Sequence, residues 1–176
     1  MTSAVSPVAN AVVAHSTFNS LRLGRTSQFV VGRLIRFWDS RNIKKNGEFM
    51  GITILLLDEL DSVIHGFIPA NRASHDRPDL KSGSIVKVDR FEVARCASTY
   101  KITEHQFVIR FTPSTRICEV LTDAPVINSE RFMVRRYDHV PFQHIYIIIY
   151  TNLELKQNIY IKINENKNCA VAQIEI

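Results

Sequence analysis

The sequence predicts an all-β domain: a small closed barrel of five short strands, with one short helix between the third and fourth strands. Two observations predict it. Short apolar runs rich in Val, Ile, Leu and Phe recur between residues 29 and 111, and turn-forming residues separate them. One longer polar stretch, residues 69–83, holds Asn, Ser, Asp, Pro and Gly, which is typical of a short helix or turn inserted between strands.

The first two strands form a predicted hairpin. The first covers residues 29–38, and Gly32 is expected to mark a bend or bulge within it. A polar loop follows over residues 39–47 and contains an Asn-Gly turn signal. The second strand covers residues 49–57.

The third strand, residues 62–68, predicts an exposed aromatic ring. Ile64 and Ile68 share one face, whereas His65 and Phe67 share the other. If the two isoleucines point into the core, Phe67 points outward.

The fourth strand is expected over residues 84–95 and the fifth over residues 105–111, with a polar loop between them. Five strands with a helical insertion before the fourth are the pattern of an OB-fold barrel. Such barrels hold single-stranded nucleic acid by base stacking and by charge.

The rest of the chain divides by composition. Residues 1–24 carry one charge and are predicted to be a flexible arm, ahead of an OB-fold nucleic-acid-binding domain over residues 25–123. Residues 124–140 contain a capping pattern that predicts a short helical extension. Residues 141–176 are dominated by Ile, Tyr, Asn and Lys and are predicted to be a divergent tail.

Charge and cysteine content limit the function classes. The formal net charge is +5, and residues 25–113 hold fourteen Lys and Arg against ten Asp and Glu, which fits a polyanionic partner. Cys96, Cys118 and Cys169 are isolated, which argues against a disulfide framework or a zinc site and fits a reducing compartment. No apolar run approaches the ~20 residues of a membrane span, and no secretory signal is visible.

Four stretches of the sequence resemble a known family in order and spacing. They are RFWDSRNIKKNGEF, ILLLDELDSVIHGFIPAN, LKSGSIVKVDRFEVA and YKITEHQFVIRF. Together they resemble the first OB-fold domain of the large (70 kDa) subunit of replication protein A, in its plant form. The resemblance implies a nuclear protein that binds single-stranded DNA in replication, repair and recombination, with other replication protein A subunits as further partners and no cofactor. The family continues into further OB domains, and residues after TNLEL depart from that continuation.

The resemblance also implies which residues bind. Two strand aromatics of the family stack on bases and match Phe67 and Phe107. A tryptophan and basic residues in the hairpin match Trp38, Arg41, Lys44 and Lys45, and a lysine before the last strand matches Lys101.

Each of these residues also has a purely structural interpretation. Phe107 shares a face with Ile109 and Phe111, which favours a core position, and buried phenylalanine is common enough to apply to Phe67 as well. Trp38 could close the barrel end, and the hairpin cations could belong to an ordinary solvated loop.

Three functional hypotheses stay open at this point. No nucleophile elbow, HExxH zinc motif or P-loop is present, so we expect a binding module without enzymatic activity, metal or small-molecule substrate. The first hypothesis is largely sequence-independent binding of single-stranded DNA. The second is a protein-interaction OB domain that binds acidic peptides, and the third is a truncated family member without activity.

Overall fold

The computed structural model describes residues 14–25, 27–42, 45–97, 102–129, 133–136 and 146–149. Residues 26, 43, 44, 98–101 and the other positions outside these ranges are not described.

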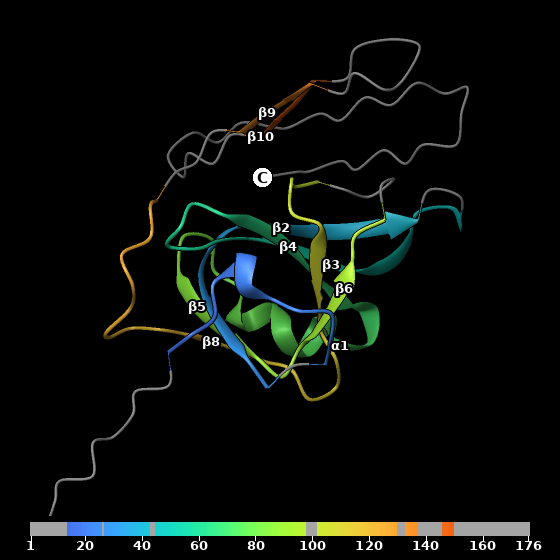
Figure 1. Cartoon of the computed structure of the whole chain (residues 1–176). Coiled ribbons are helices and arrows are strands. Elements are labelled where there is room, and N and C mark those ends of the chain that lie inside the picture. The colour runs from blue at the N-terminus through green and yellow to red at the C-terminus, as the bar shows by residue number, and fades with distance from the viewer. Residues whose placement is uncertain are drawn as a thin grey trace, which may run out of the picture.

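A single curled sheet makes up the body of the molecule (Figure 1). Its strands are β1 (Gly24–Arg25), β2 (Phe29–Asn42), β3 (Glu48–Leu57), β4 (Val63–Pro69), β5 (Ile85–Asp89), β6 (Glu92–Arg95), β7 (Phe107–Arg110) and β8 (Arg116–Glu119). Neighbouring strands follow the order β1-β6-β7-β4-β3-β2-β5-β8. Every pairing in this sheet is antiparallel except that of β4 with β7.

The sheet closes on itself because β5 and β6 belong to one stretch of chain. Arg90, at φ +57°, interrupts that stretch, so that β5 pairs with β2 and β6 pairs with β7. The closed path β2–β3–β4–β7–β6/β5–β2, with parallel third and fifth strands, is that of an OB-fold barrel. The predicted fold class is therefore confirmed, although the described part of this sheet has eight strands rather than five.

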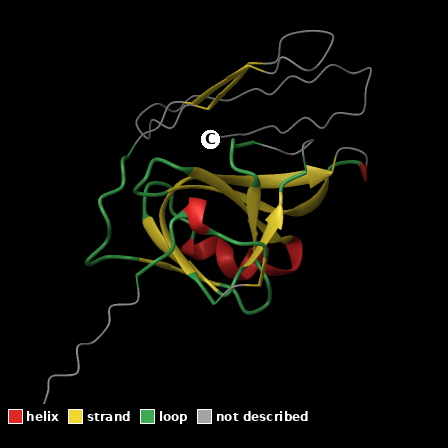
Figure 2. Cartoon of the chain, in the orientation of Figure 1, coloured by secondary structure: helices red, strands yellow, loops and turns green. Residues whose placement is uncertain are grey.

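The predicted helix stands between the third and fourth barrel strands (Figure 2). It consists of α1 (Ala70–Asp76) and a 3-10 turn, η3 (Arg77–Asp79). Arg72 donates two hydrogen bonds to Asp76, of 2.9 and 2.8 Å, and others to the carbonyl oxygens of Thr112 and Thr115. Burial of Asp76 acts to raise its pKa. The hydrogen bonds with Arg72 and His75 outweigh this and hold the pKa of Asp76 below its usual value. The helix is thereby tied to the turn after β7.

Two apolar clusters lie on opposite sides of the β2–β3–β4 sheet. The first fills the barrel and includes Leu34, Ile54 and Ile64. The second lies outside the barrel, where Ile35, Leu55, Leu57, Val63 and Ile127 pack together with Trp38, Ile85 and Ile102. One face of each of these strands is thus in the barrel core, and the other is partly covered by the loops around residues 102 and 127.

The predicted flexible arm is wrong for residues 14–24. The 3-10 turn η1 (Phe18–Ser20) buries Phe18 completely in the barrel cluster, and Ser16 bridges to Val30. The backbone N–H of Phe18 also donates to Asp58 Oδ2, at 2.9 Å. Burial and hydrogen bonds hold this segment on the barrel. Its low charge did not reveal these contacts. Residues 1–13 of the predicted arm lie outside the described residues.

Several predicted boundaries also need correction. β2 continues to Asn42, so the first four residues of the predicted loop 39–47 belong to a strand. The described part of residues 124–140 contains no helix: residues 133–136 form β9 (Met133–Arg136), which pairs with β10 (Tyr146–Ile149). Cross-strand pairing replaces the expected helix there. The rest of the predicted tail, residues 141–145 and 150–176, lies outside the described residues.

The described residues lack two features. None of the helices is long and apolar enough to cross a membrane. Within the same residues, no group of His, Cys, Asp and Glu could hold a metal ion.

Candidate nucleic-acid interface

A row of three side chains crosses the outer face of the barrel. Trp38 on β2 is paired with Thr53 on β3, and Thr53 is paired with Phe67 on β4. Residues directly opposite one another project from the same face of a sheet. Thr53 is only 7% exposed, whereas both aromatic side chains are half-buried. The two rings therefore stand two strand spacings apart, ~10 Å, on either side of a small side chain.

The orientation of Phe67 is as predicted. Ile64 and Ile68 are completely buried in the barrel cluster, so the intervening Phe67 points to the opposite side. Its ring lies over Gly51 of β3, where an added Cβ would come within 2.9 Å of the ring and against the carbonyl oxygen of Ile68. Gly51 also has φ +151°, a value that favours glycine. Because Gly51 has no side chain, β3 leaves room for the Phe67 ring.

The hairpin cations lie beside acidic residues. Arg41 is 3.8 Å from Asp39, donates to the carbonyl oxygen of Gly47 at 3.2 Å, and lies 6.0 Å from the Phe49 ring centroid. Lys45 Nζ is 3.7 Å from Glu48. Exposed ion pairs of this kind contribute little, so both cations remain available to a phosphate. Lys44 and Lys101 are outside the described residues.

Arg36 is a candidate binding residue that the sequence analysis missed. It pairs with Leu55 two positions before Trp38, after a β-bulge that places Ile35 in the outer cluster and brings Arg36 to the outer face. Within the described structure, its Nη1 atom is buried and has no hydrogen-bond partner. Burial also lowers the pKa of Arg36. An unpaired buried donor costs about 1–3 kcal/mol, which an anionic ligand would offset.

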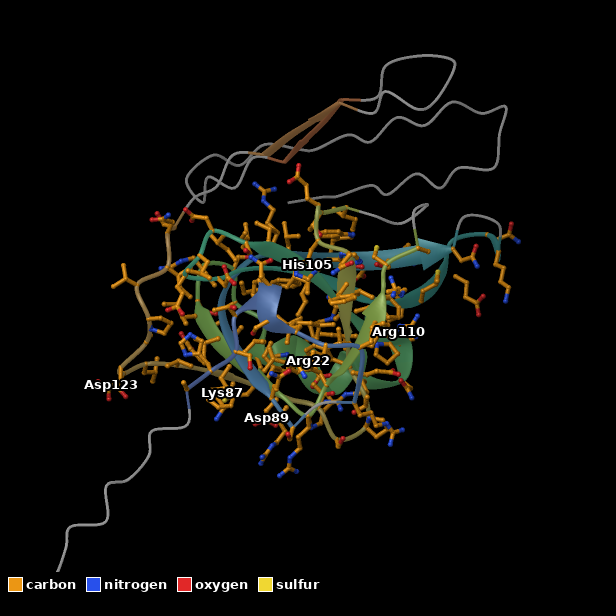
Figure 3. All side chains as sticks on the ribbon, viewed as in Figure 1. Arg22, Lys87, Asp89, His105, Arg110 and Asp123 are labelled. Carbon is orange, nitrogen blue, oxygen red and sulfur yellow. The ribbon has the colours of Figure 1, made fainter. Side chains whose placement is uncertain are left out.

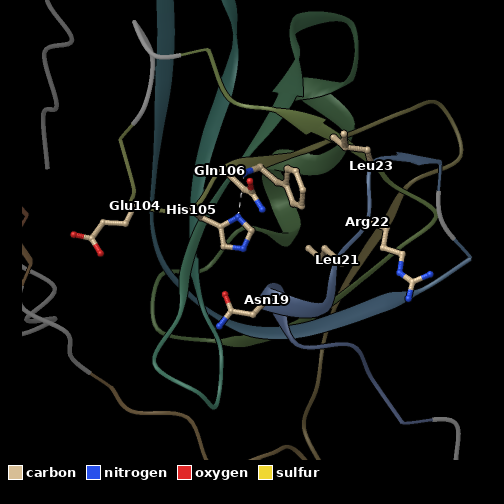
Figure 4. A pocket seen from close by; sticks show the side chains of 8 residues that line it. Asn19, Leu21, Arg22, Leu23, Glu104, His105 and Gln106 are labelled. Carbon is tan, nitrogen blue, oxygen red and sulfur yellow. Dashed lines mark hydrogen bonds between the residues drawn. The ribbon is translucent and has the colours of Figure 1, made fainter.

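Phe107 does not join Phe67 on this face. Ile109 and Phe111 belong to the barrel cluster, and Phe107 is half-buried against the same cluster. Val108 and Arg110 alternate with them and pair with His65 and Phe67 of β4. The structure therefore places Phe107 on the core side of β7, at the barrel end. There it lines a recess with residues of the N-terminal segment, shown in Figure 4.

The surface of β5 carries a second group of charged residues. Lys87 and Asp89 lie together on the side of the molecule away from His105, as Figure 3 shows. Asp89 forms an ion pair with Arg116 of β8, at 3.3 Å. Residues of this surface therefore offer charged controls for substitutions on the outer face.

His65 is buried on the outer face beside Leu55. Its Nε2 lies 3.7 Å from Cys96 Sγ, and its Nδ1 has no hydrogen-bond partner among the described residues. Burial, followed by the nearby His105, lowers the pKa of His65 from 6.5 to about 4. The folded protein therefore holds this imidazole neutral in the physiological range.

This depressed pKa predicts that the protein loses stability in mild acid. The unfolded chain binds a proton on this residue below pH 6.5, whereas the folded chain does so only below about pH 4. The contribution is complete above pH 6.5 and is lost as the pH falls toward 4. Urea unfolding of the wild type should show a loss of about 2 kcal/mol between pH 7 and pH 5. His65→Gln should lack this loss, and the exposed His75→Gln should keep it; an unchanged profile in His65→Gln would contradict the assignment.

Comparisons with known proteins identify a family and several weak structural likenesses. A family model described as "Domain of unknown function DUF223" matches residues 24–140. None of the curated proteins matches the sequence.

Three solved structures illustrate the likenesses. A replication protein A heterotrimer bound to single-stranded DNA is 14% identical with a TM-score of 0.47, covering 83% of this chain and 38% of that chain. DNA-binding domain A of Saccharomyces cerevisiae replication protein A is 12% identical with a TM-score of 0.43, covering 62% and 96%. A replication factor A related protein from Methanobacterium thermoautotrophicum is 9% identical with a TM-score of 0.45, covering 61% and 92%. These likenesses are distant, and the fold assignment rests on the strand pairing described above.

Proposed function

The chain belongs to the DUF223 family, and from that premise we propose that its OB barrel binds single-stranded DNA, largely independently of sequence. In this proposal the aromatic rings on the outer face of β2, β3 and β4 take the bases. Arg36 on that face and the cations of the hairpin between β2 and β3 take the phosphates. The protein acts as a binding module and not as an enzyme.

The observation that supports this proposal best is the row of Trp38, Thr53 and Phe67. Two accessible rings on one sheet face can each stack on a base, and stacking accepts any base because every base has a flat π face. In a duplex those faces are covered by neighbouring bases, so the same row favours single strands. Arg36 adds a half-buried cation on the same face, and its buried Nη1 atom has no hydrogen-bond partner among the described residues.

We also propose a more specific role from the sequence resemblance. The protein would act as a counterpart of the first DNA-binding domain of the replication protein A large subunit. It would work in the nucleus, in DNA replication, repair and recombination, alongside other replication protein A subunits. The proposed base-stacking pair remains Phe67 and Phe107, with Trp38, Arg41, Lys44, Lys45 and Lys101 as further contacts. Of the two aromatics, Phe67 has the stronger support because its ring stands on the outer face.

An acidic peptide is the alternative ligand, because the hairpin cations and Arg36 would also attract carboxylates. A peptide bound by charge needs no stacking, so Phe67 would matter little to it. Fluorescence anisotropy with labelled single-stranded and double-stranded oligonucleotides separates the two hypotheses. Tighter binding of the single strand supports the proposal, and equal or absent binding of both rejects it.

Salt dependence gives a prediction for Arg36. Each phosphate contact on a single strand adds about 0.7 to the slope of log affinity against log salt. Three or four contacts therefore predict a slope of roughly −2 to −3. Arg36→Gln should lower the slope by about 0.7 and weaken binding several-fold at low salt. The control is Arg116→Gln, on β8 beside Asp89, which should leave the slope unchanged. An equal slope in wild type and Arg36→Gln would exclude a phosphate contact at this residue.

A further inference from the structure

The recess that contains Phe107 is built by two segments far apart in the sequence. One is the N-terminal segment, which contributes Asn19, Leu21 and Leu23, and the other is the chain entering β7, which contributes His105, Gln106 and Phe107. The recess has a volume of about 580 Å³. This lies within the range of about 300–1,000 Å³ typical of small-molecule sites.

Leu21, Leu23 and Phe107 give the recess its apolar part. Leu21 is 4% exposed and forms part of the barrel cluster, against which Phe107 also packs. Leu23 directly precedes β1, which pairs with β6, and 47% of its surface is exposed. A large apolar side chain left open beside an aromatic ring is the environment that a flat apolar ligand would cover.

His105 connects the two segments. Its Nδ1 accepts a hydrogen bond from the backbone N–H of Phe107, so its Nε2 carries the proton and donates to the carbonyl oxygen of Phe18; both bonds measure 3.1 Å. The imidazole and Phe107 rings lie 5.7 Å apart with their planes tilted by 55°. Phe107 is therefore positioned before any ligand binds.

Two side-chain amides stand at the rim. Asn19 Nδ2 donates to Ser62 Oγ at 2.9 Å, which fixes its orientation. The backbone of Gln106 is held by a hydrogen bond from Cys96, whereas within the described part of the chain its exposed side chain has no hydrogen-bond partner. Figure 4 shows Glu104 pointing away from the other labelled residues, so its carboxylate does not face the interior.

From this arrangement we propose that the recess binds a single purine base, adenine in preference to the others. The inference rests on the proposed function and adds a base-specific position to an otherwise sequence-tolerant interface. Phe107 and Leu23 contact the faces of the base, and Gln106 pairs with its edge. A glutamine amide offers one donor and one acceptor, which match N6 and N7 of adenine. Arg22, exposed at the rim, can contact the attached phosphate.

A nucleotide titration of the full chain tests the recess itself. We expect deoxyadenosine monophosphate to shift the NMR methyl signals of Leu21 and Leu23, and deoxythymidine monophosphate to shift them less at equal concentration. Gln106→Ala should reduce the difference between the signal shifts that the two nucleotides cause. The control is Asn71→Ala, an exposed amide on α1, which should leave it unchanged. Absence of any shift at both leucines would overturn the proposal.

Oligonucleotide binding tests whether the recess works within a strand. One adenine is moved stepwise along an oligo-dT, and affinity is measured by fluorescence anisotropy. One position should bind roughly tenfold tighter than oligo-dT alone, and Gln106→Ala should remove that gain without weakening oligo-dT itself. Uniform affinity at every position, or a gain that persists in Gln106→Ala, would overturn the proposal. A third outcome is that the mononucleotide shifts the leucine signals but no single strand binds. That outcome would support the recess as a free-nucleotide site and reject the proposed function instead.

Discussion

Phe67→Ala is expected to weaken binding of single-stranded oligonucleotides by roughly five- to 140-fold. Truncating an aromatic ring that stacks on a base costs about 1–3 kcal/mol, and each 1.4 kcal/mol is a factor of ten. Phe67 belongs to neither apolar cluster, and its ring covers Gly51 on the outer face. Removing the ring should therefore affect the ligand more than the fold.

The appropriate control is Phe29→Ala. Phe29 is also half-buried, but it lies at the start of β2, where the Lys87 ammonium is 4.1 Å from its ring centroid. Its loss should leave oligonucleotide affinity within about twofold of the wild type. Thermal unfolding of both variants confirms that they are folded. If folded Phe67→Ala binds as tightly as the wild type, base stacking at this position is excluded.

Phe18→Ala is expected to lower the free energy of unfolding by about 3–5 kcal/mol. Replacing a fully buried phenylalanine with alanine removes its burial energy and leaves a cavity. The Phe18 ring packs against Gly32 so closely that an added Cβ there would lie 3.0 Å from it. Because the surrounding barrel is this closely packed, we expect it not to collapse into the cavity. The loss of unfolding free energy should therefore lie in the upper part of the ~3–5 kcal/mol range, about 4–5 kcal/mol.

Urea unfolding followed by circular dichroism measures this effect. Leu121→Ala, at a residue that is 83% exposed, should change the free energy of unfolding by less than about 0.5 kcal/mol. If Phe18→Ala were as stable as Leu121→Ala, the N-terminal segment would not be part of the barrel core. That result would restore the flexible arm predicted from composition.

Alternation along single strands was the most reliable guide to the fold and the site. In β4 the buried pair Ile64 and Ile68 correctly placed Phe67 outside. In β7 the same reasoning placed Phe107 with Ile109 and Phe111, in agreement with the structure, whereas the family resemblance drew it toward the binding face. A regular strand gives each residue a face by its position alone, so a single sequence was sufficient here.

Features that depend on neighbouring strands were not predictable in the same way. The sequence suggested a bulge at Gly32, but the bulge lies three residues further along, at Ile35. This bulge brings Arg36 to the outer face. Gly32 is instead required by the ring of Phe18 and by the carbonyl oxygen of Leu57. Phe18 itself stands among small uncharged residues, and its partners, such as Asp58, are forty residues away. Local composition carries no information about contacts of this length.

The imidazole of His105 has a thermodynamic consequence. One ring joins the carbonyl group of Phe18 to the amide group of Phe107, so the N-terminal segment and the entry to β7 are ordered together. A ligand that fills the recess contacts both segments, so its binding free energy opposes the opening of either one. Proteolysis near residue 18 should therefore slow when the recess is filled.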